Sequence, residues 1–95
     1  MPWAYVQMMR FVDAFFDRVH RYSLGVEEES ATAYLSIPVA SDVSDYEEYY
    51  ALSDEEYSAL HGDPAAARMF ADQCRRREQD DRLTLKPGWN RGQPW

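Results

Sequence analysis

The segment that most constrains the fold is TAYLSIPV, residues 32–39. Apolar side chains occupy every second position: Ala33, Leu35, Ile37 and Val39. A period of two is the pattern of a β-strand that places one face against a core. Pro38 has no N–H to donate to a neighbouring strand, so it predicts an edge strand or a strand end.

Two neighbouring segments extend this strand into a sheet. HRYSLGV also alternates and predicts a strand at about residues 20–28, and the short link EESA predicts an antiparallel hairpin. YEEYYAL, residues 46–52, is ambiguous between helix and strand. The glutamates favour a helix and the β-propensity of tyrosine favours a strand. We favour a strand, which completes a meander.

Helices are expected on both sides of this meander. Before it, apolar residues at spacings of three and four predict an amphipathic helix over about residues 4–18, although Phe11 does not fit its apolar face. After it, Ser53 and Glu56 form a capping box, which opens a short helix. Asp63 and Pro64 open a second helix, expected to reach about residue 79. Its expected inner face comprises Ala66, Met69, Phe70, Gln73 and Cys74.

The predicted fold class is therefore α+β, with an N-terminal amphipathic helix, a small antiparallel hairpin or meander and two C-terminal helices. A length of 95 residues predicts one domain, residues 1–95, of which 86–95 form an irregular tail. The alternation of Leu83 and Leu85 allows a short strand before the Pro87-Gly88 turn signal. Apolar residues make up 45% of the chain, too many for a disordered protein despite a net charge of −7.

The acidic charge limits the classes of partner. Lys86 is the only lysine among 10 basic residues, against 17 acidic ones. This excess argues against nucleic acid and anionic membrane surfaces, and favours a basic protein partner. Arg10 and Asp13 interrupt any apolar signal-peptide segment, and no stretch approaches the roughly 20 apolar residues of a membrane span. We expect a cytoplasmic protein.

The residues that most often carry chemistry show no catalytic pattern. His20 and His61 are isolated, and no HxxH or CxxC spacing predicts zinc. Cys74 is unpaired and precedes three arginines, but its place on an apolar helix face favours a core residue over a nucleophile. Consecutive helical arginines point about 100° apart and form no single phosphate patch. We expect no catalytic residue, cofactor or metal.

The acidic residues are concentrated in one block of the sequence. Residues 27–56 contain no lysine or arginine. This block is either a solvated surface or a docking surface, in which tyrosines supply rigid contact area. On the second interpretation, the predicted partner-binding residues are Asp42, Asp45, Tyr46, Glu47, Glu48, Tyr49, Tyr50, Asp54 and Glu55.

Several stretches carry a resemblance to a class of bacterial proteins. They are YLSIPVASDVSDYEEYY, SDEEY, FADQCRRREQDDRL and PGWNRGQPW, within about residues 20–95. In these stretches the chain resembles small immunity proteins of polymorphic or contact-dependent toxin systems. The resemblance implies a small, acidic, metal-free protein that covers the active cleft of a toxin, and it does not extend to residues 1–18.

Together these observations predict a non-enzymatic inhibitor of a basic toxin, such as a nuclease. The alternative is a nucleic-acid mimic that inhibits a DNA-binding defence protein, which would need a double row of carboxylates at phosphate-like spacing. A small enzyme is a third possibility, and it would need a deep pocket that joins a histidine to two carboxylates.

Overall fold

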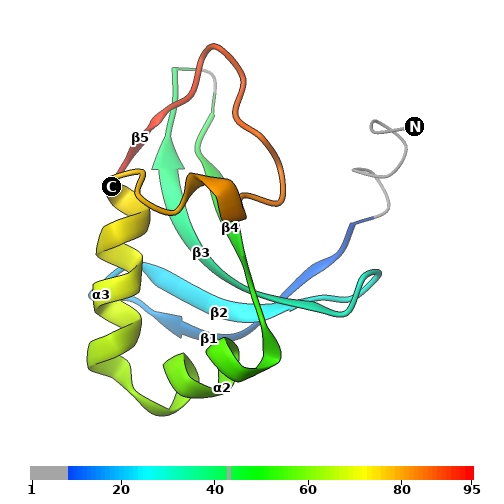
Figure 1. Cartoon of the computed structure of the whole chain (residues 1–95). Helices are drawn as coiled ribbons and strands as arrows, with labels where there is room; N and C mark the ends of the chain where they lie inside the picture. The colour runs from blue at the N-terminus through cyan, green and yellow to red at the C-terminus, as the bar shows by residue number, and fades with distance from the viewer. Residues whose placement is uncertain (1–8, 43) are drawn as a thin grey trace.

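Four antiparallel strands pair in the order in which they occur along the chain, and two helices follow them (Figure 1). The structure is a computed structural model that describes residues 9–42 and 44–95. Its elements are β1 (Phe11–Asp17), β2 (Tyr22–Glu27), β3 (Thr32–Ala40), β4 (Tyr46–Leu52), α2 (Asp54–Gly62), α3 (Pro64–Arg75), the 3-10 helix η1 (Asp80–Arg82) and β5 (Gln93–Pro94).

The predicted N-terminal helix is wrong, because residues 11–17 form strand β1. Residues 4–8 of that prediction lie outside the described residues. A β-bulge between Asp13 and Phe15 explains the error. The extra residue places Val12 and Phe15, three positions apart, opposite Val26 and Leu24 on the same face of the sheet. A bulged strand thus reproduces the spacing of a helix.

The predicted hairpin is confirmed. β2 and β3 pair in the register Leu24–Leu35, and residues 28–31 form the turn. Ala31 ends the turn with φ 58°, in the left-handed region. The ambiguous residues 46–52 form β4, as favoured, and Tyr50 and Leu52 enter the core.

Both C-terminal helices are confirmed, with two corrections to the second. The capping box of α2 is present in both directions between Ser53 and Glu56. α3 ends at Arg75 because the chain turns away through Arg77, which has φ 62°. Its buried residues are small: Ala67, Ala71 and Cys74.

The small side chains of this face allow α3 to lie close to the sheet. The larger Met69, expected to face inward, is 63% exposed, and Phe70 packs only at the margin of the core. Helix and sheet therefore meet through methyl and thiol groups, and the large apolar side chains of the core come mainly from the strands, including Leu24, Leu35, Ile37 and Tyr50.

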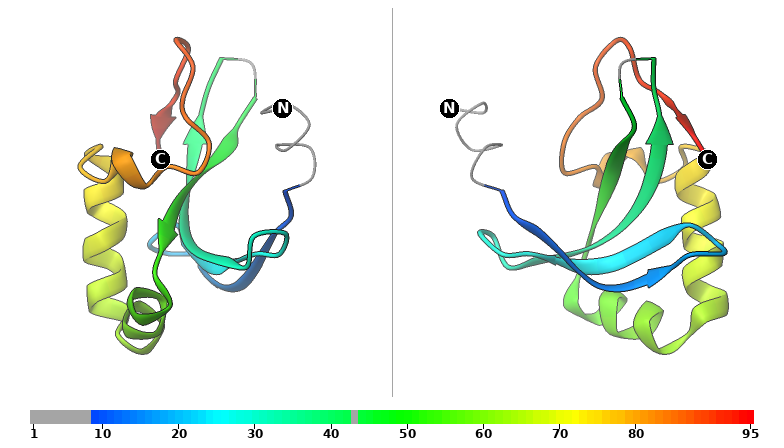
Figure 2. Two further views of the ribbon diagram at one scale, coloured as in Figure 1. Left: turned by 45° about the vertical axis from the view of Figure 1, so that its right-hand side comes forward. Right: turned by 180° about the vertical axis from the view of Figure 1, so that it is seen from behind.

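Both helices cover the same face of the sheet, and β3 is strongly bent (Figure 2). Its first half lies along β2 and its second half runs beside β4 and β5. In the described part of the chain no helix covers the opposite face (Figure 2), although Tyr34 and Ser36 of that face are buried. Within the described residues, no helix is long and apolar enough to cross a membrane.

Pro38 lies in the central strand, so the prediction of an edge strand is wrong. β2 pairs with β3 as far as Ser36, and β5 begins to pair with it at Val39. Pro38 occupies the gap between these two partners, and its carbonyl accepts a hydrogen bond of 3.3 Å from the Trp95 N–H. Since the N–H and C=O of one strand residue point the same way, the missing N–H of Pro38 would face this gap.

The C-terminal segment is partly regular rather than an irregular tail. Gln93 and Pro94 form β5, which pairs with the second half of β3. The strand considered at residues 83–85 reduces to one bridge between Leu83 and Tyr50.

Candidate binding face

The alternation of β4 divides the predicted partner-binding residues between the two faces of the sheet. Tyr46, Glu48 and Tyr50 occupy the face toward the helices, because their register partners in β3 are Val39, Ile37 and Leu35. Glu47 and Tyr49 occupy the opposite face. The consecutive residues 46–50 therefore do not form one docking patch.

Glu48 and Tyr50 are buried and hold the C-terminal segment in place. The Tyr50 hydroxyl donates to Glu48 at 2.7 Å. Arg91 Nε donates to Glu48 at 2.8 Å, and Arg91 Nη1 donates to Asp80 at 2.7 Å. The two carboxylates raise the pKa of Arg91. Tyr46 also contacts this segment, since its hydroxyl accepts the Gly92 N–H at 3.0 Å.

The other four predicted residues are exposed but lie beyond opposite ends of β4. Asp42 and Asp45 belong to the β3–β4 connection, and Asp54 and Glu55 to the first turn of α2. A seven-residue strand separates the two pairs by about 20 Å. Within the described residues, the acidic block thus forms no continuous double row.

Glu47 and Tyr49 instead join side chains from β1 and β3. We call this surface the acidic aromatic face, and its members are Phe11, Asp13, Tyr34, Ser36, Glu47 and Tyr49. The rings of Phe11 and Tyr49 stack with centroids 3.7 Å apart, and Tyr34 meets Tyr49 edge-on at 5.0 Å. Three strands separated in sequence therefore build one rigid aromatic surface.

Each carboxylate of this face receives one hydroxyl hydrogen bond. Tyr34 donates to Asp13 at 2.6 Å, and Ser36 donates to Glu47 at 3.0 Å. Gly25 makes the first bond possible, because it lies between Tyr34 and Asp13 in the sheet register. A Cβ at Gly25 would lie 2.6 Å from the Tyr34 hydroxyl and would also collide with the Val12 carbonyl.

Glu47 is a half-buried carboxyl group with no basic side chain beside it among the described residues. Burial raises the pKa of Glu47; the Ser36 hydrogen bond opposes this shift and the charge of Asp13 adds to it. Burial also raises the pKa of Tyr49 to about 12, helped by the charges of Glu47 and Asp13. The raised pKa of Tyr49 keeps its phenol neutral at pH 7.

The other partly buried carboxylates outside this face mostly have an arginine partner. Glu48 and Asp80 share Arg91, and Glu56 pairs with Arg82 at 2.7 Å. Among residues 9–42 and 44–95, neither Asp13 nor Glu47 has a basic side chain within 4.0 Å. Glu47 differs in this respect from Glu48, Glu56 and Asp80.

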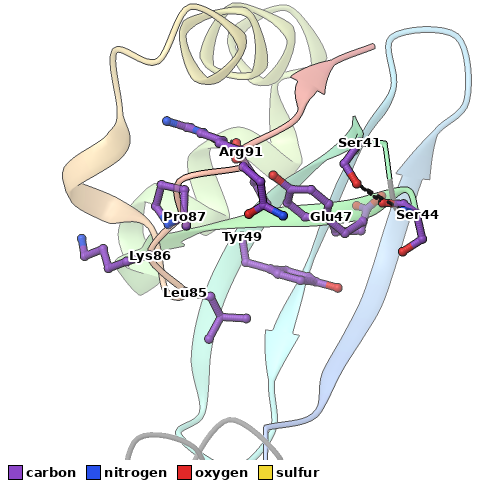
Figure 3. A pocket seen from close by; sticks show the side chains of 12 residues that line it. Ser41, Ser44, Glu47, Tyr49, Leu85, Lys86, Pro87 and Arg91 are labelled. Carbon is purple, nitrogen blue, oxygen red and sulfur yellow. Dashed lines mark hydrogen bonds and ion pairs between the residues drawn. The ribbon is translucent and has the colours of Figure 1, made fainter.

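The face continues into a hollow of about 310 Å³ beside β4 (Figure 3). Glu47 and Tyr49 line it from the strand, and Lys86 and Pro87 line it from the segment that follows η1. Glu47 therefore lines this hollow as well as belonging to the acidic aromatic face.

The cysteine and the two histidines lie outside the acidic aromatic face. Cys74 is fully buried, and its desolvated thiol has a pKa raised to about 12. His20 Nδ1 lies 3.1 Å from Asp17 in an exposed turn, and His61 lies in the last turn of α2. No group of three His, Cys, Asp or Glu side chains in the described part of the chain is placed to hold a metal.

Sequence reasoning missed four members of the acidic aromatic face. Phe11 and Asp13 were assigned to a helix, and the only signal against that helix was the misfit of Phe11 to its apolar face. Tyr34 and Ser36 were placed on the second face of their strand, but nothing in the sequence showed that β1 would bring an acid to that face.

Comparisons of the chain with models of protein families, with curated proteins and with solved structures give no match. The resemblance to immunity proteins therefore stays a prediction.

Proposed function

We propose that this protein is a non-enzymatic inhibitor that binds a basic protein, most plausibly an immunity protein that covers the active cleft of a toxin such as a nuclease. The observation that carries the proposal is Glu47, a half-buried carboxyl group on a face of stacked rings, with no basic side chain within 4.0 Å in the described part of the chain. A lysine or arginine of the partner would supply the missing cation.

The face is suited to this role because it is already organised in the free protein. Its rings are fixed by stacking and its carboxylates by hydroxyl hydrogen bonds, so little side-chain freedom is lost on binding. Hydrogen bonds between an ionised carboxylate and a guanidinium or ammonium are about twice as strong as neutral ones. The proposal places the protein in the cytoplasm, where a toxin would act on cellular targets.

The test uses affinity capture from cells of the source organism, followed by binding measurements with the captured protein. We expect Asp13→Asn/Glu47→Gln to weaken binding at least tenfold, because two charge-assisted contacts are lost. The matched control is Asp54→Asn/Glu55→Gln, which removes the same charge from α2. Equal loss in both double variants would reduce the effect to net charge and contradict the proposal.

Acidity provides a second measure of the same contact. Protonated Glu47 cannot pair with a cation, and its pKa in the free protein is raised. Wild-type affinity should therefore fall as the pH is lowered through that raised pKa, and the fall should be absent in Glu47→Gln. The immunity role makes a separate demand on the captured protein. That protein must arrest growth when it is expressed alone, and co-expression of the present protein must relieve the arrest. A captured protein that does not arrest growth would refute the immunity role.

A further inference from the structure

A groove of about 330 Å³ adjoins the acidic aromatic face across Glu47. Its lining consists of Phe16, Arg18, Arg21, Pro38, Glu47 and Trp95. It lies over the gap at Pro38, where β2 has ended and β5 has just begun. The apolar part of its lining is made by Phe16, Pro38 and Trp95.

The apolar side chains of the groove are unusually accessible. Phe16 is 57% exposed and Trp95 is 50% exposed. Exposed aromatic rings that line one groove indicate an interaction surface, because burial of their apolar area by a ligand is favourable in free energy. Trp95 is also held in place, because the Arg21 guanidinium lies 5.1 Å from the centre of its ring.

The rim of the groove is positive on the side away from Glu47. Arg18 and Arg21 belong to the β1–β2 turn, and neither lies within 4.0 Å of a carboxylate in the described part of the chain. Other arginines of this protein, such as Arg75, Arg76, Arg82 and Arg91, are paired. Two free guanidiniums beside two exposed rings select a ligand that is both apolar and anionic.

We propose that this groove binds an acidic segment of the protein partner, which inserts an aromatic or aliphatic side chain between Phe16 and Trp95 and places a carboxylate on Arg18 and Arg21. The inference rests on the proposed function, because both sites share the open face of the sheet. The partner would then meet acids at Asp13 and Glu47 and bases at Arg18 and Arg21. This polarity fixes the direction in which the partner lies across the sheet.

A nucleic acid fits the same groove less well. Aromatic rings and arginines also bind single strands, but a strand continues beyond one groove and carries a phosphate at every nucleotide. Here Glu47 closes the groove at one end, and Asp13 lies beyond it. A short segment with a local negative charge avoids this repulsion, whereas a polyanion does not.

The test needs no knowledge of the partner, because two small probes carry the same ring with opposite charge. Indole-3-acetate and tryptamine are titrated into the isotope-labelled full chain while the indole N–H signals are followed by NMR. We expect indole-3-acetate to shift the Trp95 signal saturably and tryptamine to bind at least threefold more weakly. Trp89 is 97% exposed and serves as the internal control, with an unshifted signal.

Two variants assign the charge preference to the groove. Arg18→Gln/Arg21→Gln keeps both Cβ atoms and should weaken indole-3-acetate at least threefold, whereas the surface variant Arg76→Gln should leave it unchanged. Equal binding of both probes, no saturable shift at Trp95, or tighter binding of a thymidine decamer than of indole-3-acetate would overturn the inference. If the probe titrations overturn the inference while Glu47→Gln still weakens binding of the captured partner, the proposed function is unaffected.

Discussion

At the scale of single residues, Gly25 determines whether the acidic aromatic face can form. Tyr34 reaches Asp13 by crossing the backbone of β2 at the one position without a side chain. The requirement is steric rather than conformational, because no described glycine has a positive φ. A glycine inside a strand thus marks the close approach of a neighbouring group.

We expect Gly25→Ala to destabilise the protein by about 1–3 kcal/mol, the usual cost of forcing an extra methyl group into a packed site. It should also release Tyr34 from Asp13, visible as a change in tyrosine fluorescence. Gly62→Ala is the matched control, because nothing lies within 4 Å of the added Cβ. In urea unfolding this control should be neutral or gain up to about 1 kcal/mol; equal losses in both variants would contradict the steric explanation.

At the scale of elements, β1 shows what a sequence pattern can and cannot reveal. The hairpin and the capped helices follow from local rules, namely alternation, turn length and capping residues, whereas the local rules left residues 46–52 ambiguous. β1 does not follow from local rules, because its bulge depends on pairing with β2, and the extra residue converts a period of two into a spacing of three. The candidate face inherits this limit, because Glu47 and Tyr49 were identified but the strand that brings Phe11 and Asp13 beside them was not.

The turn between β2 and β3 is stabilised by hydrogen bonds to one carboxylate, that of Glu27. The Glu27 carboxylate accepts hydrogen bonds from the Arg10 N–H at 2.7 Å and from the Ser30 N–H at 3.0 Å and hydroxyl at 2.6 Å. These bonds, with the Arg10 N–H contributing most, lower the pKa of Glu27 to about 2. A lowered pKa means that the ionised form stabilises the fold, fully so above the unfolded value of 4.5.

We therefore expect Glu27→Gln to be less stable than the wild type at pH 7. The difference should shrink as the pH falls below 4.5 and vanish near pH 2, where the wild-type carboxyl is also protonated. Urea unfolding at a series of pH values measures this convergence. Glu28→Gln is the control, since that side chain is 50% exposed and should show little effect; a constant Glu27→Gln difference across the range would argue against the linkage.

At the scale of the whole molecule, Arg91 joins the C-terminal segment to the sheet. Its side chain is 11% exposed and bridges Glu48 and Asp80. Glu48 is itself nearly inaccessible, and Arg91 is its basic partner in the described part of the chain. Removal of one partner from a buried ion pair is costly, whereas replacement of both by apolar groups is often tolerated.

We expect Arg91→Met to destabilise the protein by about 3–5 kcal/mol, because it leaves the Glu48 charge buried and unpaired. Glu48→Leu/Arg91→Met should be more stable than Arg91→Met alone. A double-mutant cycle from chemical unfolding gives the coupling energy. If the loss in free energy of unfolding of the double variant equalled the sum of the two single losses, Glu48 and Arg91 would not be coupled. That result would contradict the role of Arg91 as the partner of Glu48.

The two-residue strand β5 has a consequence for the order in which the molecule folds. β1 to β4 pair with chain neighbours through short connections, whereas Ala40 pairs with Gln93 across 53 positions (93 − 40). Closing a longer loop costs more chain entropy, and two paired residues provide little stabilisation to offset that cost. β5 is therefore expected to dock last and to open first. Since Trp95 reaches its place only through β5, the groove is completed by the final folding event, and the sheet around Glu47 can form before it.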